Sequence, residues 1–193
     1  MMASTQINTH ERILDIAQNL LETRGYNAFS YQDIADELGI KKASLHYHFA
    51  TKAALGAALA NRHAMRTRAY LAEVDAAKLD PWQKLDAFFR PFLKLASTCE
   101  RMCAGGVIAA EFPTLDIATQ GHMKSFFSTM HQWLSALLED GRNSGAFTFS
   151  GPAKVKANVM IAALEGMILL ARVRQDAGFI KPMIQDLKTS LGG

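Results

Sequence analysis

Hydrophobic residues recur at helical spacing along nearly the whole chain. Between Ile13 and Leu21 the apolar positions repeat every three or four residues, and Gly25 is suited to end that helix. No segment with the two-residue period of a strand is longer than residues 147–149. The same pattern, with its caps and breakers, predicts further helices over residues 31–38, 42–48, 52–74, 82–98, 104–111, 116–142, 152–177 and 181–191. The sequence therefore predicts an all-α fold.

The placement of these helices divides the chain into two parts. Three helices fall within the first fifty residues, and longer helices follow them. We expect a three-helix N-terminal domain over residues 1–51 and a helical bundle over residues 52–193. The helix of residues 52–74 is expected to connect the two domains.

The second and third predicted helices have the signals of a helix-turn-helix. Ser30 precedes the second helix and Asp33 follows three residues later, which resembles a capping box with Asp in place of Glu. The turn between the helices needs a residue that tolerates positive φ, and Gly39 supplies it. Thr51 is expected to cap the next helix. The apolar residues that would hold the two helices together are Ile34, Ala35, Leu38, Ile40, Leu45 and Phe49.

The third helix has one short face that is free of acidic residues. With Leu45 turned inward, Ala43 and Tyr47 face outward, flanked by Ser44 and His46. Ala43 is small enough for close approach to a base edge. Ser44 can bond a base or a phosphate, and Tyr47 can contact a thymine methyl or a phosphate. Because these residues offer few groups for direct reading of bases, part of the specificity is expected to come from DNA shape and half-site spacing.

The charge of the chain is modest, but its distribution is uneven. The 193 residues carry a formal net charge of +3. No Asp or Glu occurs between Leu38 and Ala72, a stretch that holds six lysines and arginines. Such a segment is typical of a surface that binds a polyanion, with a solvated basic face as the alternative.

Three lysines in this stretch stand where a helix N-terminus disfavours them. Lys41 and Lys42 begin one predicted helix and Lys52 begins the next. A cation there costs up to about 1 kcal/mol, because the N-terminus carries partial positive charge. Phosphates docked at both helix starts would explain these residues. The alternative is that surface lysines at helix ends are common and cheap.

Residues 10–56 resemble the TetR/AcrR family of bacterial repressors. The resemblance is carried by Arg12-Ile13-Leu14, Gly25-Tyr26, Phe29-Ser30, Asp33-Ile34-Ala35, the run from Leu38 to Phe49, and Thr51-Lys52. It implies that residues 42–48 are the recognition helix and that Ser30, Tyr47, His48 and Lys52 contact or approach phosphate. The predicted DNA-binding residues are Ser30, Tyr31, Gln32, Lys41, Lys42, Ala43, Ser44, His46, Tyr47, His48 and Lys52.

The chain departs from the family pattern at three places. Lys41 stands where the family often has Ser, and Ala53-Ala54 stand where acidic residues usually follow the lysine. Both changes should raise the attraction for phosphate. His46 stands where an aromatic residue is common, and we interpret it as a partly buried packing histidine, with DNA contact as the alternative.

The resemblance also implies a homodimer built from the last two long helices, residues 152–177 and 181–191. Between Ala157 and Ala171 only Asn158 and Glu165 are strongly polar. A helix that is apolar nearly all round must be buried on more than one side. A dimer seam satisfies this requirement, and a central core helix in a monomer is the alternative. A dimer predicts a pseudo-palindromic operator.

An effector pocket inside the bundle is the next implication of the resemblance. An aromatic and methionine stripe supplies candidate walls, although such a stripe is more often plain core. The candidates are Phe88, Phe92, Met102, Phe126, Phe127, Met130, Trp133 and Met167, with Glu111, His122 and Glu165 as polar residues.

Cys99 and Cys103 are four residues apart, a spacing at which two residues could share a helix face. Two cysteines do not make a disulfide framework, and without a His pair they fall short of a zinc site. They are small buried hydrophobes, pocket residues without reactivity, or a redox or electrophile switch. The segment from Cys103 to Glu111 resembles the electrophile-sensing NemR-like branch. In that comparison Cys103 is the sensing cysteine and Arg172 replaces a lysine.

Other function classes have less support. No nucleophile–base pair, phosphate loop or metalloprotease motif is present, so we expect no enzyme and no cofactor. A helical interaction module would leave the acid-free stretch and its lysines unexplained. The chain shows no apolar run of membrane length and no secretion signal, so a cytoplasmic protein is expected. The sequence thus predicts a ligand- or electrophile-responsive repressor.

Overall fold

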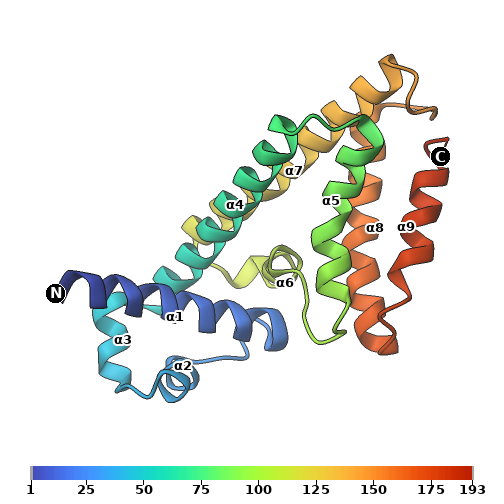
Figure 1. Ribbon diagram of the computed structural model, residues 1–193. Helices are drawn as coiled ribbons and strands as arrows, with labels where there is room; N and C mark the ends of the chain where they lie inside the picture. Colours follow the sequence, from blue (N-terminus) through green and yellow to red (C-terminus); the bar gives the residue numbers. More distant parts are fainter. Residues whose placement is uncertain (1, 193) are drawn as a thin grey trace. The chain divides into compact units, whose positions relative to one another are not determined.

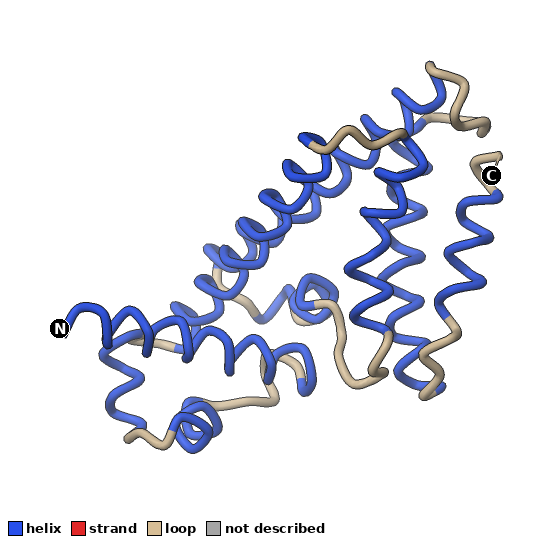
Figure 2. The backbone as a smooth tube through the Cα atoms, in the orientation of Figure 1, coloured by secondary structure: helices blue, strands red, loops and turns tan. Residues whose placement is uncertain are grey.

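The computed structural model describes the backbone from residue 2 to residue 192 and the side chains from Thr9 onward. Residues 1 and 193, the two ends of the predicted domains, lie outside it. All regular structure in the described part is helical, as Figure 2 shows, which confirms the predicted all-α fold. The helices are α1 (Met2–Arg24), α2 (Tyr31–Leu38), α3 (Lys42–His48), α4 (Lys52–Ala76), α5 (Pro81–Ala96), α6 (Ala104–Ala110), α7 (Ile117–Asn143), α8 (Ala153–Arg174) and α9 (Ile180–Thr189), with a 3-10 turn η1 (Phe112–Thr114).

Helices α2 and α3 have the predicted bounds, because their local signals act as expected. Ser30 accepts from the backbone N–H groups of Gln32 and Asp33, and Asp33 bonds back to the Ser30 N–H, which completes the capping box. Gly39 ends α2 with φ 67° and ψ 33°, the left-handed conformation that glycine adopts at little cost. Thr51 caps α4 through a 3.1 Å bond from the Ala54 N–H. These short helices are therefore defined by their ends.

The chain forms two compact units. Unit 1 holds the residues up to 65 together with 104–125, and unit 2 holds residues 66–103 and 126–193. Helices α4 and α7 each begin in unit 1 and continue into unit 2. Figure 1 labels α1, α2, α3 and α6, the helices that belong entirely to unit 1.

Unit 1 has its core where α1, α2 and α3 meet. Ile13 of α1, Ile34 of α2 and Leu45 of α3 are fully buried. Leu45 is the one buried residue of α3, so the rest of this seven-residue helix is left for solvent. Burial of a leucine contributes about 1.5–3 kcal/mol, which anchors a helix too short to be stable alone.

Unit 2 is built around α5, α7, α8 and α9. Phe88 of α5 stacks on Trp133 of α7, with ring centroids 5.6 Å apart. Helix α9 is attached by an ion pair of 2.9 Å between Lys188 and Asp86 of α5. The core of this unit includes Leu85, Phe89, Phe126, Met130, Leu134, Leu138, Leu164 and Ile168.

Candidate functional site

The exposed face of α3 is the centre of the candidate site. Ala43, Ser44 and Tyr47 are exposed around the buried Leu45, as the helical periodicity predicts, and Tyr47 is 75% exposed. No acidic residue lies in the first turn of α3. The helix therefore presents small, hydroxyl-bearing and aromatic side chains outward.

Two lysines stand at the start of this face. Lys41 is the N-cap residue of α3, and its side chain makes no capping bond. Lys41 and Lys42 are both exposed. Their ammonium groups add to the partial positive charge of the helix N-terminus, so this end of α3 attracts anions.

Tyr31 is a correction to the predicted interface. Its side chain is buried, with 5% exposed, and its hydroxyl donates to the carbonyl oxygen of Phe49 at 2.8 Å. Burial raises the pKa of Tyr31 to about 12. Tyr31 thus connects α2 to the end of α3 and is a packing residue, because an apolar ring at the first position of α2 faces the core.

The three neighbouring polar residues lie as follows. His46 is exposed, so the prediction that it is partly buried is wrong; its ring lies 4.9 Å from that of Tyr31, and Nδ1 is 3.1 Å from the Ala50 carbonyl oxygen. His48 is half-buried, with its ring edge-on to Tyr47. Gln32 is exposed and donates to Asp36 at 2.7 Å.

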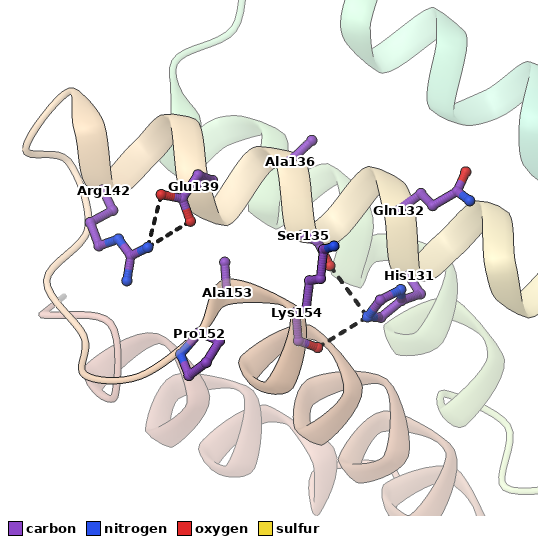
Figure 3. Close-up of a pocket in the computed structure, with 9 residues that line it drawn as sticks. All are labelled: His131, Gln132, Ser135, Ala136, Glu139, Arg142, Pro152, Ala153 and Lys154. Carbon is purple, nitrogen blue, oxygen red and sulfur yellow. Dashed lines mark hydrogen bonds and ion pairs between the residues drawn. The ribbon is translucent and has the colours of Figure 1, made fainter.

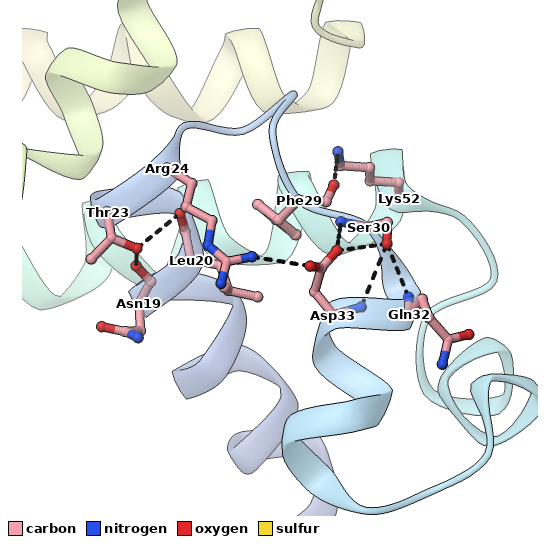
Figure 4. A network of polar contacts seen from close by, with 9 residues as sticks. All are labelled: Asn19, Leu20, Thr23, Arg24, Phe29, Ser30, Gln32, Asp33 and Lys52. Carbon is pink, nitrogen blue, oxygen red and sulfur yellow. Dashed lines mark hydrogen bonds and ion pairs between the residues drawn. The ribbon is translucent and has the colours of Figure 1, made fainter.

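Ser30 and Lys52 belong to a network of polar contacts, which Figure 4 shows. The Ser30 hydroxyl donates to Asp33 at 2.7 Å, and Arg24 forms an ion pair of 3.0 Å with the same carboxylate. The hydrogen bonds from Ser30 and the charge of Arg24 lower the pKa of Asp33. These contacts therefore favour the ionised form of the capping carboxylate.

Lys52 has contacts within unit 1. It is half-buried, and its ammonium donates to the carbonyl oxygen of Phe29. The same nitrogen lies 4.9 Å from the ring centre of Tyr26 and 4.6 Å from that of Phe29. Burial lowers the pKa of Lys52. Its charge thus serves first to attach the start of α4 to the residue before the α2 cap, because the aromatic rings and the carbonyl surround it.

The acid-free stretch is less uniform in space than in sequence. Arg62 of α4 forms ion pairs with Asp15 at 2.7 Å and Glu11 at 3.6 Å, and donates to the Leu14 carbonyl oxygen. All three partners belong to α1. The sequence missed this neutralisation because the acids lie 47 or more residues away from the arginine. The positive charge of the candidate site is therefore concentrated at Lys41 and Lys42.

The predicted effector residues fall into both units. Glu111 and His122 lie in unit 1, and the other predicted residues lie in unit 2. Phe88, Phe92, Phe126 and Met130 are buried, while Met102 and Trp133 are half-buried. Trp133 donates from Nε1 to Asp75 at 2.9 Å.

The two cysteines do not share a helix face. Helix α5 ends at Ala96, and Cys99 lies beyond it with φ 56°. Both cysteines are free thiols and buried. Cys103 donates to the carboxylate of Glu165 in α8. Burial raises the pKa of Glu165, and this hydrogen bond opposes the rise.

A cavity of about 500 Å³ lies in unit 2. Figure 3 shows His131 beside the carbonyl oxygen of Lys154, and Arg142 Nη2 donating to both carboxylate oxygens of Glu139; the distance from His131 Nε2 to the Lys154 oxygen is 3.0 Å. The cavity is lined by His131, Gln132, Ser135, Ala136, Glu139, Arg142, Pro152, Ala153 and Lys154. None of the predicted effector residues is among them.

Metal sites and membrane-spanning helices are both absent from the described residues. No group of three or more His, Cys, Asp or Glu side chains there is arranged to hold a metal ion. None of the helices in that part of the chain has the length and apolar character needed to cross a membrane.

The chain is similar to known regulators over most of its length. Residues 13–59 match the family model described as bacterial regulatory proteins, tetR family. A TetR transcriptional regulator from Legionella pneumophila is 32% identical, with a TM-score of 0.83 over 94% of this chain and 96% of that one. The regulator LmrA of Bacillus subtilis is 28% identical, with 85% and 86% covered. The repressor NemR of Escherichia coli strain K12 is 24% identical, with 90% and 88% covered.

The two roles of the lysines make a prediction about stability. Lys52→Met removes a charged donor from the Phe29 carbonyl, so the free energy of unfolding should fall by about 1–3 kcal/mol. Lys42→Met, the control, removes an exposed cation from a helix start and should leave stability unchanged or slightly higher. Urea denaturation of the two variants measures both effects. Equal stability of the two variants would contradict the structural role of Lys52.

Proposed function

Because the chain belongs to the TetR family of bacterial transcriptional regulators, which bind DNA and are not enzymes, we propose that it is a ligand- or electrophile-responsive repressor. It binds a pseudo-palindromic operator in the cytoplasm as a homodimer. The observation that carries the DNA-binding part is the exposed face of α3, with two lysines at its start and no acid on it. The name of the relative NemR, a transcriptional repressor, supports the sign of regulation.

The DNA surface follows from the directions of the α3 side chains. With α3 in the major groove, Ala43, Ser44 and Tyr47 approach base edges. Lys41 and Lys42 bind phosphate beside the helix N-terminus. Since Ser44 is the one small hydrogen-bonding side chain on this face, direct reading covers few bases and DNA shape contributes the rest.

An apolar stripe on α8 supports the homodimer. Val155, Val159, Leu169 and Val173 are exposed, and their spacing of four, ten and four residues keeps them on one face of the helix. The opposite face, which includes Met160, Leu164 and Met167, is buried in the chain's own core. Helix α8 is thus buried on one side only within one chain, and a second copy would cover the other. A two-fold dimer places two α3 helices about one turn of DNA apart.

Of the two cysteines, Cys103 is the better candidate for a reactive switch. A thiol adds to an electrophile as the thiolate, so its proton must pass to a neighbouring base or to water as the sulfur attacks. Glu165 accepts the Cys103 hydrogen bond and is positioned to take that proton. Addition would place new atoms in a buried site between α8 and the residue before α6, where they force a rearrangement. A packed cysteine without reactivity is the second candidate.

The DNA surface predicts different effects for different side chains. Lys42→Met should lower affinity for all duplexes and reduce the slope of log affinity against log salt by about 1 per bound copy. Ser44→Ala and Tyr47→Ala should also change which sequences are preferred, at about 1–3 kcal/mol per lost base contact. Binding of the variants to a duplex selected by the native protein from random DNA, titrated at several salt concentrations, measures both. Salt-independent binding by the native protein would exclude the phosphate-docking surface.

The α8 stripe predicts a variant that is monomeric but folded. Val159→Glu places charge in the middle of the proposed seam, so the dimer should dissociate at least a hundredfold more readily. Gln132→Glu adds the same charge at an exposed position of α7, outside the two helices of the proposed seam, and should remain dimeric. Sedimentation velocity gives the assembly state, and circular dichroism checks that both variants are folded. A dimeric Val159→Glu variant would place the seam elsewhere.

The cysteine switch is tested with a Michael acceptor such as N-ethylmaleimide. Treatment should release the native protein and the Cys99→Ser variant from operator DNA. The Cys103→Ser variant should stay bound, because it lacks the nucleophile. Mass spectrometry locates the adduct. Release of the Cys103→Ser variant to the same extent as the native protein would rule out the switch.

A further inference from the structure

Glu111 bonds to the turn between α1 and α2, outside the proposed DNA surface. It follows α6 directly and is the N-cap residue of η1, although its side chain makes no capping bond there. Its Oε1 accepts the Tyr26 backbone N–H at 3.1 Å, and its Oε2 accepts the Asn27 N–H at 2.9 Å. One carboxylate thus binds two consecutive amides that are more than eighty residues distant in the chain.

These amides belong to the α1–α2 turn, residues 25–29. Helix α1 ends at Gly25, whose φ of 105° turns the chain sharply and directs the next N–H groups away from the helix. A Cβ at position 25 would lie 3.0 Å from Glu111 Oε1, so turn and carboxylate are in close contact. Tyr26 is buried, and a buried N–H without a partner is strongly disfavoured. The turn therefore depends on Glu111 for its conformation.

The same turn is bonded to the start of α4. The Tyr26 hydroxyl donates to the Lys52 carbonyl oxygen at 2.8 Å, and the Lys52 ammonium donates to the Phe29 carbonyl. The chain between these two points consists of α2, α3 and their turns. Both ends of the helix-turn-helix thus meet at the α1–α2 turn, which Glu111 holds from α6.

In the chain, α6 comes directly after a segment of unit 2. Ala104, its first residue, follows Cys103, the last residue of a segment of unit 2. Helix α6 is seven residues long, so Glu111 comes one residue after a short rigid segment that starts at the unit boundary. Helix α6 and Glu111 are thus the covalent continuation of Cys103 into unit 1.

We propose that Glu111 is a positioning residue for DNA binding, whose carboxylate couples the end of α6 to the orientation of the recognition helix α3. The inference rests on the proposed function, in which α3 reads DNA. Binding of the two amides favours the DNA-competent arrangement, and loss of either bond allows the α1–α2 turn to relax. Glu111 touches no DNA, so it acts on affinity only through the turn.

The experiment compares Glu111→Gln with a matched variant in the same unit. Glutamine keeps the size of the side chain but offers one acceptor oxygen and no charge, so one amide faces an NH₂ group. Asp116→Asn is the control, because Asp116 also caps a helix start, through Thr119, and bonds neither Tyr26 nor Asn27. Both variants lose one acid and are expected to lose some stability.

Three readouts separate positioning from stability. Affinity per folded molecule for the duplex selected by the native protein should fall roughly 3- to 30-fold in Glu111→Gln and stay within about twofold of native in Asp116→Asn. Affinity for a random duplex of equal length should be unchanged in both, because non-specific binding depends on charge at α3. Amide exchange should show protection of Tyr26 and Asn27 in the native protein and in Asp116→Asn, with loss in Glu111→Gln.

The outcomes are distinguishable from failure of the proposed function. If the native protein binds no duplex in a salt-dependent manner, the proposed function fails and with it this inference. If the native protein binds and Glu111→Gln binds the selected duplex equally well, only the role of Glu111 is overturned. Equal loss in both variants also overturns it, because the effect then follows general stability. If the Glu111→Gln variant does not fold, amide exchange of the native protein decides. Unprotected amides of Tyr26 and Asn27 in the native protein would then reject the inference.

Discussion

The orientation of α3 depends on bonds made at its two ends, because the helix itself has one buried side chain. Leu45 is the one buried side chain that anchors α3 in the core of unit 1. The left-handed Gly39 turn fixes the first end, and the hydrogen bond from Tyr31 to Phe49 fixes the second. A seven-residue helix cannot form alone in water, so these contacts decide both its existence and the direction of its exposed face.

The charges of unit 1 divide into those that hold the fold and those left for a ligand. Arg62 pairs with acids of α1, Arg24 pairs with the capping Asp33, and Lys52 is surrounded by aromatic rings and a carbonyl oxygen. Lys41 and Lys42 are exposed at the start of α3. A cation near a helix N-terminus weakens the helix, and a phosphate at the same place reverses the sign of that effect. The start of α3 thus carries a small instability that a phosphate bound there would remove.

The proposed regulation depends on the point where the chain passes from unit 2 to unit 1, between Cys103 and Ala104. Cys103 ends a segment of unit 2 and bonds to Glu165 of α8, the helix with the exposed apolar stripe. Glu111, eight residues further along the chain, bonds to the α1–α2 turn. In this proposal a ligand or adduct at Cys103 acts on α3 through the eight residues that lead to Glu111. Such coupling requires that the ligand or adduct bind one of two conformations of the protein more tightly than the other.

The all-α fold, the bounds of α2 and α3 and the exposed face of α3 can be predicted from local signals in the sequence: a capping box at Ser30, a glycine at 39 and one inward leucine. Which charges and rings are available for a ligand depends on contacts between segments that are distant in the chain. Tyr31 and Lys52 match a DNA-binding pattern in the sequence, but in the structure both bond to backbone carbonyl oxygens of unit 1. Cys99 and Cys103 do not share a helix, because α5 ends at Ala96. Glu111 carried no local signal for its role, because its partners are two backbone amides more than eighty residues away, and a contact between distant segments has no period in the sequence.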